Sequence, residues 1–159
     1  GSLAVYLPIL LPKFQLSMTL GAVLLMTYSL LASLGQLPFG FFSDRFPQFK
    51  FATSGLLITG LLISAVAWAP TYSTAFFLLC IAGLSTAAFH PQSAAIAGSA
   101  AARSRSFGMA VFMTAGRAGY AIGPIVAAPI AVLFGPKYLL LLALPAVVIS
   151  LAIQRNWKV

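Results

Sequence analysis

One arginine and one histidine lie within long apolar stretches, where ionisable residues are rare. Arg117 lies near the middle of residues 106–134, and His90 lies near the middle of residues 74–98. A guanidinium group carries a planar set of donors that suits a carboxylate or a phosphate. The only acidic residue in the chain is Asp44, so Arg117 has no carboxylate partner in any apolar stretch. An anionic ligand is therefore one hypothesis, and solvation of Arg117 by backbone carbonyls and water is the alternative.

His90 precedes Pro91, and the proline removes a backbone donor from any helix that contains it. The carbonyl groups left without that donor need another partner. His90 could be this partner, a group that carries protons, or a contact to a ligand. Three further residues are candidates for the same cavity, although each could instead only bridge helices: Gln92, Gln36 and Tyr28.

The composition indicates that lipid surrounds most of the chain. Of the 159 residues, 61% are hydrophobic and 6% are charged. A soluble domain of this size has about 25% charged residues, and disordered chains are poor in apolar residues. The net charge of +8 does not indicate nucleic acid, because the basic residues are scattered between apolar runs rather than clustered. No nucleophile–base pair, carboxylate pair or metal-ligand cluster is present, so we expect neither an enzyme nor a metal or cofactor site.

Five apolar stretches are long enough to cross a membrane as helices. One further apolar stretch, residues 1–12, is too short to cross a membrane and lacks the features of a signal peptide. We interpret it as the end of a first helix whose beginning is missing, with a short interfacial segment as the alternative. The predicted fold is an all-α membrane protein, a single six-helix bundle over residues 1–159. Its complete helices are expected at residues 18–42, 51–69, 74–98, 106–134 and 138–153.

The basic residues divide unequally between the two sides of this bundle. If the spans alternate in direction, one side receives Arg45, Lys50, Arg103, Arg105, Arg155 and Lys158, and the other receives Lys13 and Lys137. Cytoplasmic loops carry the excess of Lys and Arg. The positive-inside rule therefore predicts that the C-terminal end of this segment is cytoplasmic.

Two short motifs add to this reading. Gly119, Gly123 and Pro124 form a GxxxGP sequence, which favours close helix packing followed by a kink. Gly40 in the segment GFFSDR would allow close contact between helix ends. Asp44 and Arg45 follow at the mouth of the bundle, where they could form contacts that lock one conformation and release in another.

These motifs resemble those of the major facilitator superfamily. Gly40 with Asp44 and Arg45 is similar to the G-x-L-a-D-R loop motif between its second and third helices. Gly119 with Gly123 and Pro124 is similar to the G-x-x-x-G-P motif of its fifth helix, which is associated with antiporters. Both motifs fall in the expected helices when residues 1–12 are counted as the first. The resemblance implies the N-terminal half of that fold, built of three-plus-three inverted repeats.

A closer resemblance is to the fosmidomycin-resistance branch. The sequence AFHP at residues 88–91 is similar to its A-x-F-H-P in the fourth helix, and AGRAGYAIGP at residues 115–124 to its G-G-N-x-G-x-x-x-G-P. The sequence YLPILLP at residues 6–12 fits the outer end of its first helix. Arg117 departs from the asparagine that is usual in the branch. The basic end of the loop motif is also thin, with Lys50 alone after Phe46.

The resemblance implies a secondary transporter in a bacterial inner membrane that works by alternating access. The expected function is proton-coupled efflux of a small anionic or drug-like compound. Expected partners are the lipid bilayer, this substrate, protons, and a C-terminal six-helix half or a second copy; no nucleic acid is expected. Two alternatives stay open: a half-size subunit that acts as a dimer, and a membrane scaffold or sensor that transports nothing.

Overall fold

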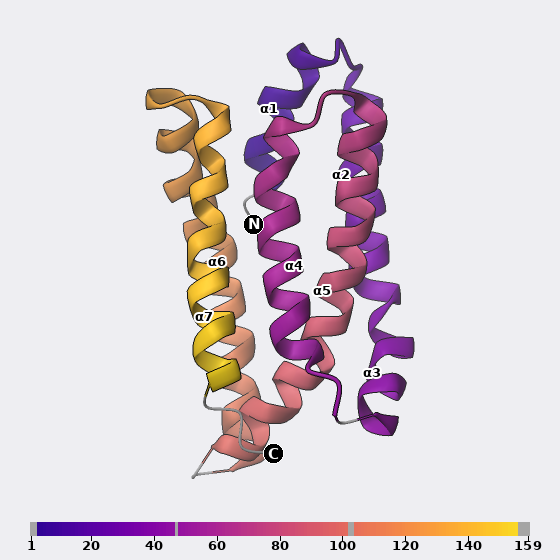
Figure 1. Cartoon of the computed structure of the whole chain (residues 1–159), viewed down its shortest axis with the longest axis vertical. Helices are drawn as coiled ribbons and strands as arrows, with labels where there is room; N and C mark the ends of the chain where they lie inside the picture. Colours follow the sequence, from indigo (N-terminus) through magenta and orange to yellow (C-terminus); the bar gives the residue numbers. More distant parts are fainter. Residues whose placement is uncertain (1–2, 47, 102–103, 156–159) are drawn as a thin grey trace.

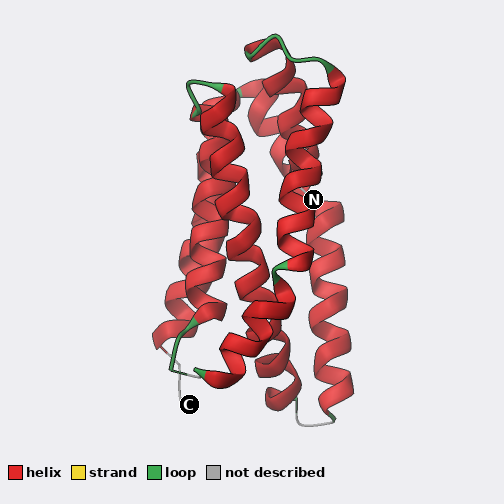
Figure 2. Cartoon of the chain, turned by 90° about the vertical axis from the view of Figure 1, so that its right-hand side faces the viewer, coloured by secondary structure: helices red, strands yellow, loops and turns green. Residues whose placement is uncertain are grey.

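The computed structural model describes residues 3–46, 48–101 and 104–155, and these residues form a bundle of long helices (Figures 1 and 2). No strand occurs among them. The bundle confirms the predicted all-α fold. The elements are α1 (Leu3–Lys13), α2 (Met18–Leu34), α3 (Gln36–Arg45), α4 (Phe51–Ala65), the 3-10 turn η1 (Val66–Trp68), α5 (Tyr72–Ala100), α6 (Arg105–Leu133), the 3-10 segment η2 (Pro136–Leu142) and α7 (Ala143–Arg155).

Three of the long helices begin at a serine or threonine that caps the first turn. The hydroxyl groups of Ser17, Thr71 and Ser104 accept hydrogen bonds from the backbone N–H groups three residues later, at 3.3, 3.2 and 3.2 Å. Such a cap satisfies one of the four N–H groups that a helix start leaves without an internal partner. These three capping residues therefore mark where α2, α5 and α6 begin.

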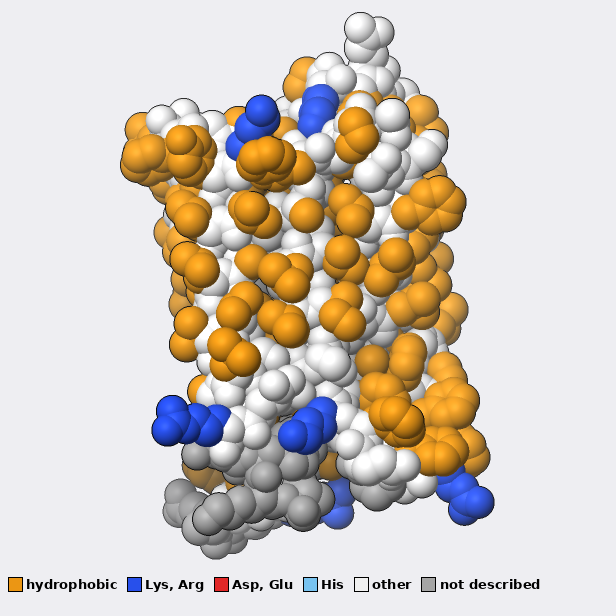
Figure 3. Space-filling model, viewed as in Figure 1, with side chains coloured by type: hydrophobic (Ala, Val, Ile, Leu, Met, Phe, Trp, Pro, Cys, Tyr) orange, Lys and Arg blue, Asp and Glu red, His pale blue; other side chains and the backbone are white. Residues whose placement is uncertain are grey.

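Five helical segments in the described chain are long and apolar enough to cross a membrane, so this is an integral multi-pass membrane protein. They run over Met18–Arg45, Phe51–Trp68, Tyr72–Ala100, Arg105–Leu133 and Pro136–Arg155. Figure 3 shows hydrophobic side chains around the middle of the visible face and Lys and Arg side chains near both ends. We call the two ends the Lys13 end, which also holds Lys137, and the Arg45 end, which also holds Lys50, Arg105 and Arg155. Arg103 and Lys158 lie outside the described residues.

Helix α5 lies at the centre of the packing, and glycines bring its neighbours close. A Cβ atom placed at Gly83 of α5 would lie 2.8 Å from the Tyr28 carbonyl oxygen of α2. One placed at Gly55 of α4 would lie 2.6 Å from the Ser85 carbonyl oxygen of α5. Both contacts are to backbone, so these helices touch along their main chains. Close backbone approach at small residues is the main source of helix association in lipid.

Glycines also bring successive spans close together. Gly21 at the start of α2 packs against Leu7 and Leu11 of α1, and Gly108 at the start of α6 packs against Ala97 and Ala101 of α5. The helices α4 and α7 also meet, where Gly60 contacts the Ala146 side chain, so the first three spans pack directly on the last three.

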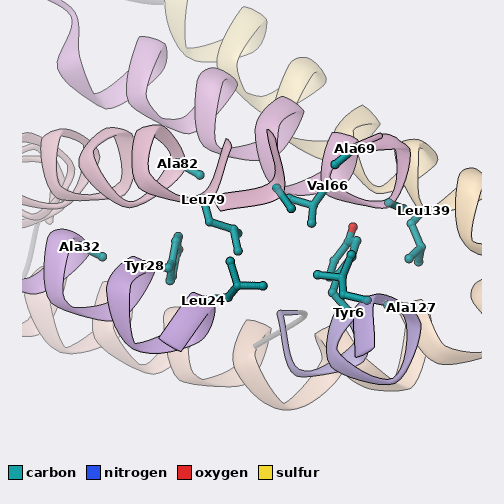
Figure 4. Close-up of a cluster of buried hydrophobic side chains, with 13 residues drawn as sticks. Tyr6, Leu24, Tyr28, Ala32, Val66, Ala69, Leu79, Ala82, Ala127 and Leu139 are labelled. Carbon is teal, nitrogen blue, oxygen red and sulfur yellow. The ribbon is translucent and has the colours of Figure 1, made fainter. Parts of the chain in front are cut away.

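Buried apolar side chains from the first three and the last three spans meet in one cluster (Figure 4). Tyr6 of α1, Leu24 of α2, Val66 of η1, Leu79 of α5 and Leu139 of η2 are each at most 2% exposed. In Figure 4 the Tyr6 ring points towards the side where Val66 and Ala69 lie. The cluster ties the short helix α1 to the rest of the bundle.

A small polar network crosses three helices near the middle of the bundle. The Tyr28 and Thr86 hydroxyl oxygens lie 3.1 Å apart, and those of Thr59 and Thr86 lie 3.2 Å apart. Thr86 also donates to the Ala82 carbonyl oxygen at 2.8 Å. Polar groups within a membrane must find partners inside the protein. This network supplies them for α2, α4 and α5.

Two of the spans expected as single helices contain a change in backbone geometry. The expected helix at residues 18–42 divides into α2 and α3 at Gly35, and its helical part continues to Arg45. A Cβ atom at position 35 would lie 2.8 Å from the Ala87 side chain of α5, so the glycine permits this close crossing. The last span begins as η2 rather than as an α-helix, directly after Gly135, whose φ angle is +100°.

Candidate functional site

A cavity of about 830 Å³ opens between α4, α5, α6 and α7. Most of the side chains that line it are apolar. Four carry polar groups, namely His90 and Ser93 of α5 and Arg117 and Tyr120 of α6. A mostly apolar pocket with a few converging polar groups is typical of small-molecule sites. The cavity is therefore the strongest candidate for a binding site in the described chain.

The structure brings His90 and Arg117, the two ionisable residues singled out in the sequence, to this one cavity. His90 is half-buried, and Arg117 is exposed on α6. The only acidic residue of the chain, Asp44, is in α3 at the Arg45 end and does not line the cavity. The lining therefore carries a fixed positive charge and no negative one.

Three aromatic rings in the lining of this cavity meet on the seam between α5 and α6. The ring centroids of Phe89 and His90 lie 5.2 Å apart, and the Phe112 centroid lies 6.1 Å from each of them. Phe89 and His90 are neighbours on α5, and Phe112 comes from the facing α6. These rings hold the His90 imidazole at the wall and offer apolar surface to the carbon part of a ligand.

The structure places Gln92 in a different role. Its side chain is 8% exposed and does not line the cavity. The Oε1 atom accepts a hydrogen bond from the Ala52 N–H at 2.7 Å, and the Nε2 atom donates to the Phe49 carbonyl oxygen at 2.9 Å. Gln92 thus caps the first turn of α4 from the neighbouring helix α5 and fixes the segment that precedes α4. Its predicted contact with a ligand stays a prediction.

Gln92→Leu is expected to destabilise the bundle by about 2–4 kcal/mol, because it leaves the buried Ala52 N–H and the partly buried Phe49 carbonyl oxygen unpaired. The measurement is thermal unfolding of the full-length protein in detergent. Gln36→Leu is the matched control, since the exposed Gln36 side chain bonds only to Ala32 of its own helix, at 2.9 Å. Equal unfolding temperatures for the two variants would show that the bonds of Gln92 contribute nothing.

Gln36 and Tyr28 are also placed away from the cavity lining. The Gln36 amide bonds back to its own helix, and the buried Tyr28 hydroxyl pairs with Thr86. These two residues bridge or cap within the bundle in this conformation. A role for either in a ligand cavity stays a prediction.

The predicted gating residues lie on α3. Gly40 faces α5, where a Cβ atom at this position would come 3.8 Å from Pro91. Asp44 and Arg45 are both exposed, in the last turn of α3. Their predicted locking contacts stay a prediction.

The predicted packing motif lies on α6, most of whose surface is not covered by other described helices. Gly119 has no atom within 4 Å of a Cβ position, and the same is true of Gly116. In the most apolar window of α6 only 6% of residues are buried, against 39% in α5. The predicted packing of Gly119, Gly123 and Pro124 against another helix therefore stays a prediction, and its partner would lie outside the described residues.

Sequence reasoning missed several lining residues that complete the cavity, namely Phe112, Tyr120 and Ser93. Phe112 and Tyr120 lie within two turns of Arg117 on the same helix. Tyr120 follows Arg117 by three residues, which places it on the same face of the helix, whereas Phe112 precedes Arg117 by five. Helical spacing was therefore an available signal for Tyr120 from Arg117 and for Ser93 from His90, but not for Phe112.

Comparisons with known proteins agree with this picture. The sequence matches the family model described as Major Facilitator Superfamily over residues 1–155. It is 28% identical over 161 residues to the "Uncharacterized MFS-type transporter YfnC" of Bacillus subtilis (strain 168), a match that covers 97% of this chain and 39% of the relative. It is 27% identical over 156 residues to the "Fosmidomycin resistance protein" of Escherichia coli (strain K12), covering 96% of this chain and 38% of the relative. The chain thus spans well under half the length of these curated relatives. No solved structure matches it.

Proposed function

Because this chain belongs to the Major Facilitator Superfamily, we propose that it supplies the N-terminal helices of a transporter. The transporter exports a small anionic or drug-like compound in exchange for protons. One relative carries fosmidomycin resistance in its name, which supports export of such a compound. On this proposal the chain is not an enzyme.

The observation that carries the proposal is the shared cavity of Arg117 and His90. An uncompensated arginine in a membrane span costs several kcal/mol, so it is found where a partner or water offsets the cost. With no carboxylate of the chain in the cavity, a substrate carboxylate or phosphate is the partner of suitable charge. The apolar lining around it would exclude polar compounds that lack a negative charge.

The two residues take different parts in the cycle. Arg117 keeps its charge throughout, because a guanidinium group does not lose its proton in proteins. The His90 imidazole, by contrast, can gain and lose a proton. Exchange requires that the proton and the substrate occupy the site in turn. Neutral His90 accepts a hydrogen bond from the bound substrate, and protonation of His90 from outside removes this acceptor nitrogen and releases the substrate. Rocking of two helical bundles about this site would expose it to each side in turn.

A second bundle follows from the exposure of α6. We propose that a C-terminal six-helix half, or a second copy of this half, covers α6 in the whole protein. The Arg45 end carries four described basic residues and the Lys13 end carries two. By the positive-inside rule, the Arg45 end would then lie on the cytoplasmic side of a bacterial inner membrane.

The test is transport by the full-length protein in liposomes, with fosmidomycin as the probe. An imposed proton gradient is expected to drive fosmidomycin across the membrane against its concentration gradient. If the rate of fosmidomycin transport does not depend on the proton gradient, transport is not coupled to protons. No movement of fosmidomycin, benzoate or glycerol phosphate would contradict the choice of anionic substrates.

His90→Gln is expected to lower gradient-driven transport by about tenfold, which corresponds to about 1.4 kcal/mol. Exchange of labelled for unlabelled substrate without a gradient should continue, since glutamine keeps a polar side chain there. The control is Ser99→Ala, at the exposed end of the same helix, where the hydroxyl bonds only to Ile96 at 3.0 Å. If His90→Gln keeps the full response to pH, His90 does not carry the proton.

A further inference from the structure

Two lysines at the Lys13 end are held around one short turn. The Lys13 Nζ atom donates to the Ala67 carbonyl oxygen at 2.8 Å and lies 5.3 Å from the centroid of the Phe14 ring. The carbonyl belongs to the turn η1, which ends α4. The first lysine is therefore tied to the second residue of this turn.

The second lysine is tied to the next residue of the same turn. The Trp68 Nε1 atom donates to the Lys137 carbonyl oxygen at 3.0 Å. The Lys137 Nζ atom in turn lies 5.3 Å from the centroid of the Trp68 ring. Because Ala67 and Trp68 are adjacent, ammonium groups from α1 and η2 both lie beside this turn, one at its backbone and the other at the Trp68 ring.

These two charges have no acidic partner in the chain. Asp44 is the only acidic residue, and α3 places it at the Arg45 end. An ammonium group has three donors, and the carbonyl of Ala67 occupies one of those of Lys13. The Lys137 Nζ atom lies over the face of the Trp68 ring, a contact that leaves its N–H donors able to bind an anion.

The position of the pair indicates where this anion comes from. Lys13 ends α1, Trp68 ends the span of α4, and Lys137 is the second residue of the last span. The ends of spans lie at the level of lipid headgroups, where tryptophan is enriched and lysines extend towards the polar layer. Trp68 is 53% exposed, and Figure 3 shows two basic side chains among hydrophobic ones at this end.

We propose that Lys13, Lys137 and Trp68 form a binding site for a phosphate anion at the membrane interface, filled by the headgroup of an anionic phospholipid. The two ammonium groups bind the phosphate oxygens, and the Trp68 ring packs beside the glycerol part of the lipid. Contacts with η1 already restrict both lysine side chains, so less conformational entropy is lost on binding. The lipid would join α1, α4 and η2 at this end of the bundle.

The experiment follows the fluorescence of Trp68 in the full-length protein in detergent, defined as the emission that Trp68→Phe removes. Brominated phosphatidylglycerol is added to one sample and brominated phosphatidylcholine to another. Quenching of Trp68 is expected at about fivefold lower amounts of phosphatidylglycerol than of phosphatidylcholine, which corresponds to about 1 kcal/mol. The Lys13→Gln/Lys137→Gln double variant should lose this preference.

Two controls separate charge at this site from charge elsewhere. Lys13→Arg/Lys137→Arg keeps both charges and should keep the preference, as should Lys50→Gln at the Arg45 end. Relief of quenching by millimolar inorganic phosphate would support the site and show that free phosphate also fills it; no relief would support a lipid as its occupant. An equal preference in the wild type and the double glutamine variant, or none in the wild type, would overturn the proposal.

Discussion

Replacing Arg117 by alanine is expected to reduce efflux of an anionic substrate by about 100-fold, or about 2.7 kcal/mol. The guanidinium group is the only fixed charge in the lining of the cavity between α4 and α7. A hydrogen bond to a charged group contributes about 1.5–3 kcal/mol, so the loss corresponds to one or two such bonds. Initial rates of fosmidomycin transport by the full-length protein in liposomes measure it.

The pattern among variants distinguishes the substrate role of Arg117 from a role in folding. Arg117→Lys keeps the charge but loses the planar pair of donors, so about tenfold loss is expected. Arg105→Gln, at the exposed start of the same helix, should transport normally. Arg117→Ala should also unfold at the wild-type temperature or higher, because it removes an unpaired charge. Unchanged efflux in Arg117→Ala would remove this residue from the site.

The charge pattern made much of the architecture predictable. The single acidic residue and the long apolar stretches indicated membrane helices before any fold was known. The caps at Ser17, Thr71 and Ser104 are also local, because each hydroxyl bonds to a backbone group three residues later. Local patterns of this kind specify helices and their starts, and the structure confirmed the all-helical membrane fold.

The role of Gln92 could not be predicted in this way. Its two partners, Phe49 and Ala52, are 43 and 40 residues away in sequence. A polar residue beside a proline suggested a ligand cavity, which stays a prediction, but nothing in the local sequence indicated that it would cap another helix. The same limit applied to Lys13, whose carbonyl partner Ala67 is 54 residues distant. Hydrogen bonds from a side chain to a distant backbone group depend on how the helices pack. The hydrophobic periodicity of the sequence does not predict them.

A close backbone contact between α4 and α5 gives the prediction with the largest effect on folding. Gly55→Leu is expected to reduce the yield of folded, monodisperse protein by about tenfold or more, because overpacking at backbone contacts cannot be relieved by rotamer changes. A Cβ atom at this position would lie 2.6 Å from the Ser85 carbonyl oxygen and 3.0 Å from the Phe89 backbone nitrogen. To admit a leucine, α4 and α5 would have to separate, which would also displace Gln92 from Ala52. Fluorescence-detected size exclusion of the full-length protein measures the yield.

Gly116→Leu is the matched control, since no atom of the described residues lies within 4 Å of a Cβ at that position. On contacts within this bundle alone, its yield should stay within about twofold of the wild type, as for a site without close neighbours. A wild-type yield for Gly55→Leu would show that α4 and α5 do not approach each other this closely. A low yield for Gly116→Leu as well would indicate that a helix beyond this chain packs on α6, as the motif of Gly119 and Gly123 predicts. The two glycines therefore test separately the packing inside the bundle and the packing of its uncovered face.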